Sequence, residues 1–455
     1  LADYAPVRGC MIIEPYGYAL WENIQASLDK RFKGKGVKNA YFPLFIPESF
    51  LAKEAEHVQG FAPELAIVTH AGGEELTEKL IVRPTSETII GEWAKKKLQS
   101  YRDLPLLLNC WNNVVRWELR TKLFMRTTEF LWQEGHTFHA TFDEADKFAR
   151  TMLDVYHDFE MNDAAMSPLA GQKTAGETFA GAHTSFSLEA LLGDRKALQS
   201  CTSHNLGNNF TRAIGIQYLD RDNKLIHAFG TSWGLSTRII GGIVMTHGDD
   251  KGLRLPPQIA PIQAVIVPIY RKSEEAGPVL EKVEQIKRDL EARSVRVEVD
   301  MREGVTPGFK FNDWEMRGVP LRVEIGPKDV AANQVVMARR DSGDKQAVPL
   351  DQLVTRAAET LDAIQKSMLA RARKFREDNT FVVDSYEEFK QRTAGEGGTG
   401  FLMAHWCGKS SCEKKIQEET KATIRCIPFD QVKETGKCIY DGDTSEGRVA
   451  FAKAY

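Results

Sequence analysis

The features that would assign this 455-residue chain to a specialised class of protein are scarce. No run approaches the ~20 consecutive apolar residues of a membrane-spanning helix, and no apolar segment of the secretory type opens the sequence. Neither sign of charge is in excess, because 60 lysines and arginines stand against 63 acidic residues. This balance excludes a polycation that coats nucleic acid, although a local basic groove is compatible with it.

Cysteine is also scarce. Seven cysteines are too few, and odd in number, for a disulfide scaffold, so we expect reduced thiols and a cytoplasmic protein with no membrane contact. What is present is an ordinary globular composition, 42% hydrophobic and 27% charged. The length predicts two to four domains of roughly 100–200 residues each.

Three regions of different texture predict three domains, at 1–260, 261–365 and 366–455. The first is rich in aromatic side chains, and the proline-rich segment 255–262 follows it as a linker. The second alternates short apolar strands with helical patterns, which is typical of an α/β unit. A helical, charge-rich stretch from about residue 351 leads into the third, which contains four of the cysteines.

Polar and aromatic residues gather on two predicted strands of the first region, after a predicted helix at 16–32 and a strand at 40–47. Over 115–119, apolar and charged residues alternate, which places Arg116 and Glu118 on one strand face. A second strand presents four side chains on one face: Phe130, Trp132, Glu134 and His136. Side by side, the two strands would offer arginine, carboxylate, aromatic and imidazole groups to one surface. An exposed hairpin with solvated charges is the alternative.

Six motifs follow one another along the chain: AYFPLFIP at 40–47, RPTSET at 83–88, RWE with RTTEF at 116–130, QSCTSH at 199–204, SWGLSTR at 232–238, and PGFKF with GPKD at 307–329. In this order they resemble the motifs of class II aminoacyl-tRNA synthetases, specifically the prolyl-tRNA synthetase family. The resemblance implies an α+β catalytic domain on an antiparallel sheet, an α/β anticodon-binding domain and a small C-terminal α+β domain of zinc-binding type. It also implies a homodimer, since the first motif is the family's dimerisation element.

The reaction implied by the resemblance joins an amino acid to the α-phosphate of ATP in the presence of Mg²⁺. Arginine suits this chemistry because its planar fork binds two oxygens and stays charged. The catalytic residues implied are Arg116, Arg126 and Arg238. The ATP-binding residues implied are Arg116, Glu118, Arg126, Thr127, Phe130, Gln199, Thr202, Ser236 and Arg238.

Selection of proline requires a pocket for a cationic imino group and an apolar ring, and a buried carboxylate can pair with the cation. The resemblance implies that proline binds to Thr85, Glu87, Arg116, Trp132, Glu134, His136 and His204. A helix N-cap at Thr85 and a satisfied core histidine at His204 are the alternatives. The stretch 137–198 is too short for the editing domain that some family members insert there, so the chain resembles the archaeal/eukaryote-like type.

Recognition of the tRNA is assigned by resemblance to the α/β domain, where unpaired bases can stack on aromatic rings and bond at their edges. The anticodon residues implied are Phe311, Glu315, Arg322 and Lys328, and ordinary fold-supporting roles are the alternative. Basic candidates for the tRNA backbone are Arg271, Lys272, Lys282, Lys287 and Arg288, which a solvated helix face explains as well.

The four cysteines of the tail, Cys407, Cys412, Cys426 and Cys438, predict a structural zinc ion. By resemblance the ligands include Cys407, Cys412 and Cys438, and Asp441 stands where a late cysteine would be. The fourth ligand is then Asp441 or Cys426, unless the site is degenerate and empty.

The leading hypothesis is therefore a member of this family that activates L-proline with ATP and transfers it to tRNA-Pro. Histidyl and threonyl members of the subclass would require a glycine-rich histidine loop or a cysteine and two histidines for an active-site zinc, and neither pattern is complete. The alternative from another class is a noncatalytic, synthetase-like RNA-binding protein. Such a protein would be expected to lack Arg116, Arg126 or Arg238, and the chain has all three.

Overall fold

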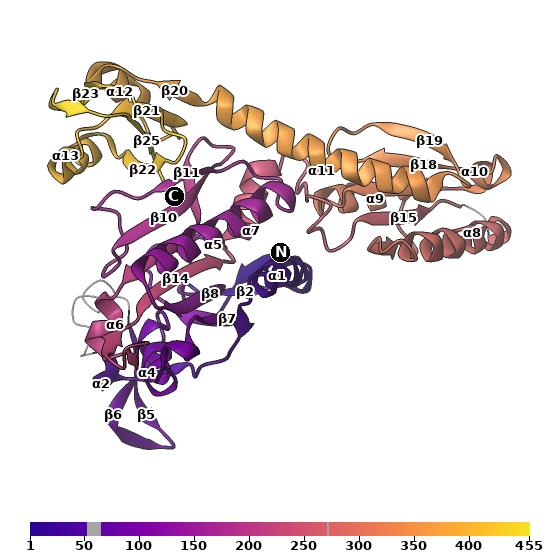
Figure 1. The fold of residues 1–455 in the computed structure, drawn as a ribbon. Helices are drawn as coiled ribbons and strands as arrows, with labels where there is room; N and C mark the ends of the chain where they lie inside the picture. Colours follow the sequence, from indigo (N-terminus) through magenta and orange to yellow (C-terminus); the bar gives the residue numbers. More distant parts are fainter. Residues whose placement is uncertain (52–64, 271–272) are drawn as a thin grey trace.

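The computed structural model describes residues 1–51, 65–270 and 273–455 (Figure 1). Its main feature is an 11-stranded sheet in the order β20-β21-β25-β22-β9-β10-β11-β14-β8-β7-β3. All neighbours in this sheet are antiparallel except the parallel pairs β20–β21 and β3–β7. Among the helices in the described ranges, none combines the length and apolar character needed to cross a membrane.

The N-terminal region up to the linker at 255–262, called the catalytic domain here after the resemblance, contributes the following elements to this sheet: β3 (Lys38–Asn39), β7 (Leu106–Val115), β8 (Glu129–His139), β9 (Leu169–Gln172), β10 (Thr184–Leu191), β11 (Ala197–Gly207) and β14 (Phe229–Ser236). Smaller strands lie around it: β1 (Ala2–Tyr4), β2 (Met11–Ile13), β4 (Phe45–Pro47), β5 (Ala66–Ala71), β6 (Glu74–Val82), β12 (Gln217–Leu219) and β13 (Leu225–His227). Its helices are α1 (Pro15–Gly34), α2 (Glu48–Leu51), α4 (Glu87–Lys97), η3 (Tyr101–Asp103), α5 (Phe142–Asn162), α6 (Asn209–Ile214) and α7 (Arg238–His247).

Helices α1 and α5 build the main core against one face of the sheet. The start of α5 is capped by Thr141, whose hydroxyl accepts from the Glu144 amide at 3.2 Å. Buried side chains recur along α5 every three or four residues, from Ala145 to Phe159, so one helix face packs against β10, β11 and β14. The opposite face of these strands lines the cavity described below.

The predicted helix at 16–32 is confirmed as α1, and the predicted strand at 130–136 lies within β8. Of the strand predicted over 40–47, only the last three residues form a strand, β4, and β3 ends just before the predicted segment. The strand predicted over 115–119 is wrong, because β7 ends at Val115 and a loop follows. Trp117 and Leu119 are 48% and 83% exposed, so the alternation in this segment has no apolar surface to pack on.

The second domain is an α/β unit with the strand order β16-β15-β17-β18-β19, and β15 pairs in parallel with both β16 and β17. Its strands are β15 (Ala264–Pro268), β16 (Val297–Val299), β17 (Leu321–Ile325), β18 (Gln334–Arg339) and β19 (Lys345–Pro349). Its helices are α8 (Ser273–Glu291), α9 (Pro307–Met316), α10 (Pro327–Ala331) and α11 (Leu353–Asp378). Because α11 runs unbroken past residues 365 and 366, the boundary predicted there falls inside a helix.

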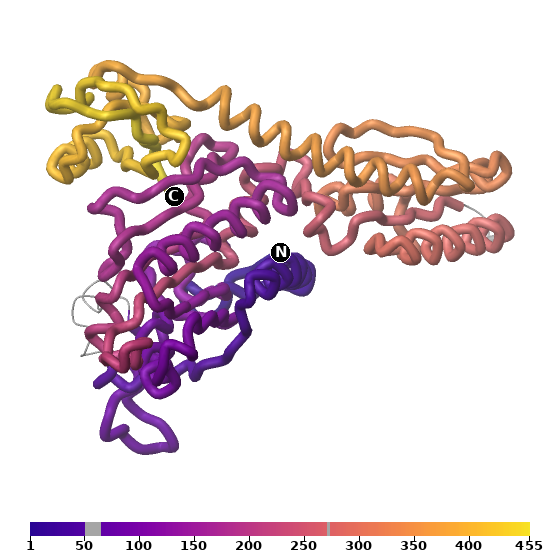
Figure 2. The backbone as a smooth tube through the Cα atoms, viewed as in Figure 1, coloured from indigo at the N-terminus to yellow at the C-terminus, as the bar shows by residue number. Residues whose placement is uncertain are grey.

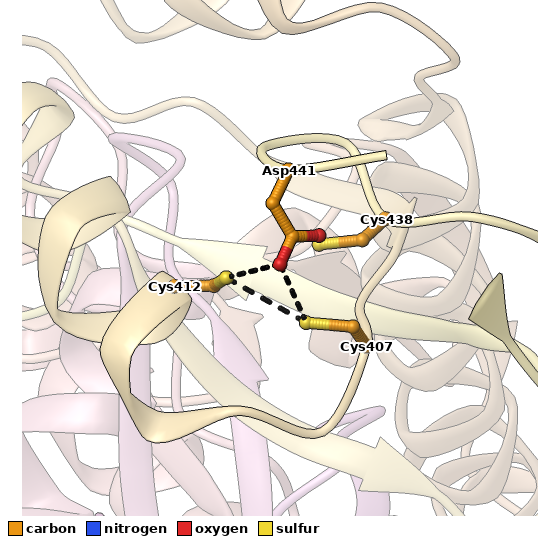
Figure 3. A group of neighbouring side chains, drawn as sticks. All are labelled: Cys407, Cys412, Cys438 and Asp441. Carbon is orange, nitrogen blue, oxygen red and sulfur yellow. Dashed lines mark hydrogen bonds between the residues drawn. The ribbon is translucent and has the colours of Figure 1, made fainter. Parts of the chain in front are cut away.

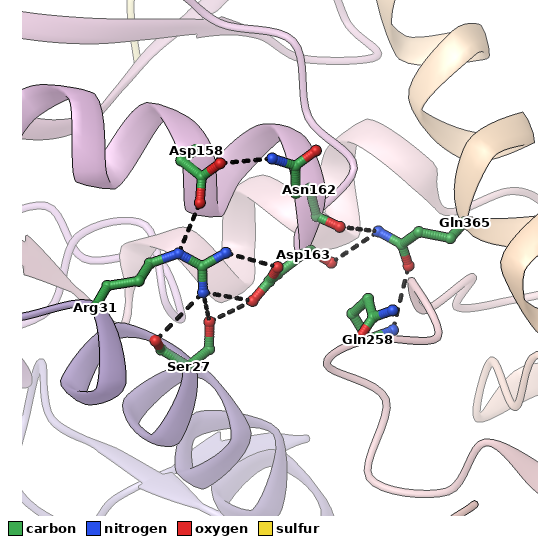
Figure 4. A network of polar contacts seen from close by, with 7 residues as sticks. All are labelled: Ser27, Arg31, Asp158, Asn162, Asp163, Gln258 and Gln365. Carbon is green, nitrogen blue, oxygen red and sulfur yellow. Dashed lines mark hydrogen bonds and ion pairs between the residues drawn. The ribbon is translucent and has the colours of Figure 1, made fainter. Parts of the chain in front are cut away.

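A polar network fixes α11 against the catalytic domain (Figure 4). The Gln365 side chain donates to the carbonyls of Asn162 and Asp163 at 2.8 and 3.1 Å, and its oxygen accepts from the Gln258 amide at 3.2 Å. Asp163 in turn binds the guanidinium of Arg31 at 3.0 Å. The network therefore joins α1, the end of α5, the linker and α11.

The C-terminal domain extends the catalytic sheet. Its elements are β20 (Thr380–Val382), α12 (Tyr386–Thr393), β21 (Phe401–His405), α13 (Ser410–Thr420), β22 (Thr423–Pro428), β23 (Gly436–Lys437), β24 (Thr444–Ser445) and β25 (Arg448–Ala452). Strand β22 pairs with β9 through Ile427 and Gln172. The chain returns along α11 from the α/β domain, and its C-terminus lies against the catalytic domain (Figure 2), where the Tyr455 amide donates to the Ala197 carbonyl at 3.2 Å.

Candidate active site

Three adjacent strands carry the floor of the principal cavity, which has a volume of about 260 Å³. The antiparallel register pairs Glu134 with Gly234 and His136 with Ser232, so all four residues lie on the same face of the sheet. Strand β11 continues this face, because its Thr202 and His204 pair with the same two residues of β14. The opposite face is core, and a Cβ at Gly135 would lie 2.1 Å from the Trp233 ring.

The segment before α4 forms one end of the cavity. Arg83 is fully buried and donates to the carbonyls of Phe42 and Asn113, both at 2.7 Å, which anchors the turn that follows. Thr85 donates a short hydrogen bond to the carboxylate of Glu87, the first residue of α4. The N-cap of α4 is Ser86 and not Thr85, so the capping alternative for Thr85 is wrong. A buried carboxylate thus faces the cavity from a helix N-terminus.

Glu134 is held by several protein donors. Its oxygens accept from the Asn112 amide group at 2.8 Å, from the Ser86 amide at 3.2 Å and from the Ser86 hydroxyl. The His136 ring lies 3.0 Å from the same carboxylate. Burial opposes the cationic form of His136, but the Glu134 hydrogen bond and the charges of Glu87 and Glu134 together raise its pKa above the ordinary value.

His204 lines the same cavity, and its pKa shifts in the opposite direction. Its Nδ1 lies 2.8 Å from the Ser185 hydroxyl, and the Phe179 ring stacks on it at 4.8 Å between centroids. Burial lowers the pKa of His204 to about 4, so this ring is neutral near pH 7. The cavity therefore combines carboxylates with two imidazoles whose pKa values shift in opposite directions, upward for His136 and downward for His204.

Two arginines, Arg116 and Arg238, also line the cavity. Arg116 lies over the rings of Phe130 and Trp132, at 5.7 and 5.4 Å, and donates to the Pro84 carbonyl at 3.0 Å. Arg238, at the start of α7, donates to the Met125 carbonyl at 2.9 Å. Burial and the neighbouring charges of Arg116 and Arg126 lower the pKa of Arg238. This concentration of positive charge can bind a polyphosphate next to a zwitterionic amino acid.

A smaller adjoining cavity of about 60 Å³ shares Arg116, Phe130, Ser236 and Arg238 with the first. It adds Glu118 and Arg126, which form an ion pair at 2.7 Å, and Thr127. The two cavities are thus lined by every residue predicted for proline and ATP: Thr85, Glu87, Arg116, Glu118, Arg126, Thr127, Phe130, Trp132, Glu134, His136, Gln199, Thr202, His204, Ser236 and Arg238.

Sequence reasoning missed one wall of the principal cavity. Lys173, Glu177 and Phe179 line it from the segment between β9 and β10, together with Ser185 of β10. The only local signal is a mixture of charged, aromatic and glycine residues in KTAGETFAGA at 173–182. Nothing in that pattern indicates what the segment packs against.

Three of the four predicted anticodon residues form a cluster. Arg322 lies over the Phe311 ring at 4.2 Å and pairs with Glu315 at 3.2 Å, and Lys345 also lies over Phe311, at 5.1 Å. Lys328 is exposed on α10 and, within the described chain, makes no hydrogen bond or ion pair with this cluster. Among the basic candidates for the tRNA backbone, Lys287 lies 4.0 Å from the Glu291 carboxylate, and Lys282 donates a hydrogen bond to the Gln285 side chain. Arg271 and Lys272 fall outside the described residues.

A cysteine cluster lies in the C-terminal domain (Figure 3). One ligand atom from each of Cys407, Cys412, Cys438 and Asp441 lies within 4.8 Å of the others. Three thiols and a carboxylate in this arrangement fit a tetrahedral zinc ion. Cys426 lies elsewhere, in the core under Gly171, so the geometry favours Asp441 as the fourth ligand.

Comparisons with known proteins agree with the geometry. Three family models match: the tRNA synthetase class II core domain (G, H, P, S and T) at 69–247, the anticodon binding domain at 263–360, and the prolyl-tRNA synthetase C-terminal domain at 386–455. The fold and the cavity thus define a class II aminoacyl-tRNA synthetase, as the motifs and the predicted architecture indicated.

The relatives specify the family. The chain is 53% identical to proline–tRNA ligase 2 of Clostridioides difficile, over 100% of this chain and 94% of that protein. It is 52% identical to the chloroplastic/mitochondrial proline–tRNA ligase of Arabidopsis thaliana, over 100% of this chain and 84% of that protein. The crystal structure of Cryptosporidium parvum prolyl-tRNA synthetase, complexed with halofuginone and AMPPNP, superposes with a TM-score of 0.95 at 36% identity, covering 100% of this chain and 95% of that one. The chain belongs to the prolyl-tRNA synthetase family.

Proposed function

We propose that the protein activates L-proline with ATP and transfers the prolyl group to tRNA-Pro. The observation that carries this proposal is one cavity lined both by the Glu87 carboxylate and by the guanidinium groups of Arg116 and Arg238. A noncatalytic RNA-binding protein would have no need to keep this charge arrangement buried. Membership of the prolyl-tRNA synthetase family supports the catalytic role as well.

Activation is an in-line displacement at phosphorus. A carboxylate oxygen of proline attacks the α-phosphorus of ATP, the bond to the bridging oxygen of the β-phosphate breaks, and pyrophosphate leaves with the electron pair. Arg116 holds the α-phosphate and the proline carboxylate, while Arg126 and Arg238 hold the γ-phosphate. Phe130 stacks on adenine, and Glu118, Thr127, Gln199, Thr202 and Ser236 complete the ATP site. Mg²⁺ supplies further neutralisation of phosphate charge.

The imino group of proline is held by Glu87 and Thr85, and the ring lies between Trp132, His136 and His204. Glu134 acts through its neighbours, because protein donors already occupy its oxygens and it orients His136. In the second step, a ribose hydroxyl of the tRNA attacks the prolyl carbonyl carbon and AMP leaves. The cluster of Phe311, Glu315 and Arg322, with Lys328 nearby in sequence, binds the anticodon.

The roles of the arginines are tested by Arg116→Ala in proline-dependent ATP–pyrophosphate exchange. Loss of a bidentate phosphate contact predicts a fall in kcat of about 10²–10³ or more. Arg120→Ala, a change at an exposed residue of the same loop, is the control and keeps its activity. Exchange at the wild-type rate in folded Arg116→Ala protein would remove Arg116 from the mechanism.

The cysteine cluster holds a structural zinc ion, with Cys407, Cys412, Cys438 and Asp441 as ligands. Metal analysis of purified protein should give about one zinc per chain, by the ligand count of a closed site. Cys438→Ser should lose the zinc, and Cys426→Ser should retain it because its thiol lies in the core. Equal zinc loss in both variants, or none in the wild type, would contradict this assignment.

The protein is a homodimer that associates through its N-terminal region. Support comes from exposed apolar side chains on β1, β2 and α1, where Tyr4 is 70%, Ile12 51% and Tyr18 42% exposed. Met11, Ile13, Tyr18 and Leu131 also line a surface cavity of about 250 Å³ beside these elements. Such a contiguous apolar surface is typical of an interface. Sedimentation at a single-chain mass of 51.1 kDa would contradict the proposal.

A further inference from the structure

The wall of the principal cavity formed by residues 173–179 is attached to the C-terminal domain at two places. At the first, Lys173 donates to the Glu189 carboxylate at 3.1 Å and to the Arg425 carbonyl at 2.8 Å. The Arg425 guanidinium binds the other oxygen of Glu189 at 2.8 and 2.9 Å. All three side chains are buried, and Arg425 is contributed by β22.

The second attachment joins the middle of the segment to α13. The Thr174 hydroxyl donates to the Glu413 carboxylate at 2.8 Å, and both side chains are buried. The fit is close, because a Cβ at Gly176 would lie 3.1 Å from a Glu413 oxygen. Glu413 therefore lies against the segment at both Thr174 and Gly176.

From these attachments the segment continues into the cavity. Glu177 and Phe179 line the cavity, and the Phe179 ring stacks on His204. The Phe179 amide donates to the Ser185 hydroxyl at 3.0 Å, and that hydroxyl lies 2.8 Å from His204 Nδ1. A displacement of the segment would thus alter the surroundings of His204, which the proposed function places beside the proline ring.

We propose that Glu413 and Arg425 of the C-terminal domain are positioning residues that hold the segment 173–179 in place and thereby set the affinity of the cavity for the amino acid. The segment does not line the adjoining cavity of Arg116, Arg126 and Arg238, where the proposed function places the phosphates, so the affinity for ATP should change less than the affinity for the amino acid. The inference rests on the proposed function only for the identity of the amino acid. The attachment itself can be measured without catalysis.

The first readout is amide hydrogen exchange in the absence of ligands. The Glu177 amide bonds the Thr174 carbonyl, and the Ala182 amide bonds the Phe179 carbonyl, so protection in 173–183 reports the order of the segment. Thr174→Val keeps the shape of the side chain and removes the donor, and Glu413→Ala removes the acceptor. Each should accelerate exchange in this segment about tenfold, the effect of losing one buried hydrogen bond.

Two further variants separate positioning from general stability. Glu413→Gln keeps an oxygen that can accept from Thr174, so it should retain wild-type protection. Glu418→Ala removes an exposed carboxylate from the same helix and should change nothing in the segment. Acceleration by Glu418→Ala, or slow exchange retained in Thr174→Val, would overturn the proposal.

The second readout is ATP–pyrophosphate exchange with proline. Thr174→Val and Glu413→Ala should raise KM for proline about five- to tenfold and leave KM for ATP within about twofold. An equal rise in both KM values would overturn the claim about affinity. So would an unchanged KM for proline in a variant whose segment exchanges its amide hydrogens faster. Absence of proline-dependent exchange in the wild type would instead refute the proposed function, while hydrogen exchange would still decide whether the attachment orders the segment.

Discussion

The principal cavity is lined by side chains of both charges, the Glu87 carboxylate and the guanidinium groups of Arg116 and Arg238. The proposed function assigns Glu87 to the imino group of proline and the arginines to phosphate and carboxylate oxygens. Removing the Glu87 charge should therefore affect the two substrates differently, because only proline carries a cation.

For Glu87→Gln we expect KM for proline to rise by about ten- to a hundredfold, since a buried hydrogen bond to a charged group contributes roughly 1.5–3 kcal/mol. KM for ATP should stay within about twofold. Steady-state pyrophosphate exchange over both substrate concentrations measures the two constants. Equal changes in both would remove Glu87 from the imino pocket.

Another residue, Glu160 on α5, makes the stability of the catalytic domain depend on pH. Its side chain is fully buried, and this burial raises its pKa to about 8 from the ordinary 4.5. The folded state thus takes up a proton that the unfolded state has released, and the resulting stability is lost as pH rises from about 4.5 through 8. Each unit of pKa difference is worth about 1.4 kcal/mol.

Glu160→Gln cannot titrate, so the difference in Tm between the variant and the wild type should grow in favour of the variant as pH rises across this window. Thermal unfolding at pH 5, 6, 7 and 8 measures the difference. A difference that is constant with pH would show that Glu160 is not protonated in the folded protein.

Among the helices, strands and motifs, the sequence predicted those features that depend on local periodicity or on the chemistry of a motif. Helix α1 and strand β8 follow from periodicity, and the positions of Arg116, Arg126 and Arg238 follow from motifs whose chemistry requires arginine. The strand expected over 115–119 failed because alternation alone does not provide a surface to pack on.

The cavity wall at 173–179 was not predictable for a different reason. Its position depends on β22 pairing with β9, and this pairing joins residues about 250 positions apart along the chain. Local sequence patterns carry no information about such a contact. The same applies to the choice between Asp441 and Cys426 as the fourth ligand, which the sequence analysis left open, because only the tertiary fold places Cys426 in the core and Asp441 beside three thiols.

The junction of β9 and β22 depends on Gly171. A Cβ there would lie 2.4 Å from the Ile427 carbonyl oxygen and 2.7 Å from the Cys426 Cβ, so a side chain would push the strands apart. Gly171→Ala should destabilise the junction by roughly 1–3 kcal/mol, the usual cost of overpacking. Limited proteolysis and Tm measure the loss.

Gly397→Ala is the matched control, since a Cβ at that position meets no atom within 4 Å. Its Tm should remain close to that of the wild type. A wild-type Tm for Gly171→Ala would show that the strands separate without cost and that the sheet is not a rigid connection.

At the scale of the whole molecule, three domains are combined around one sheet and one helix. The catalytic and C-terminal strands form a continuous sheet, and α11 connects the anticodon-binding domain to the C-terminal domain across the catalytic domain (Figure 1). Strands β9 and β10 separate the C-terminal strand β22 from β11, β14 and β8, which carry the principal cavity. The cluster of Phe311, Glu315 and Arg322 lies in the α/β domain, from which α11 leads to the C-terminal domain.

The most direct test of the central claim is amino-acid-dependent ATP–pyrophosphate exchange with each of the twenty amino acids and no tRNA. The account predicts the highest kcat/KM with proline, and weaker exchange with the smaller alanine and cysteine, because a pocket rejects a ligand by only about 1–3 kcal/mol per missing methylene. Exchange led by another amino acid, or no exchange with any of them in folded protein, would contradict it.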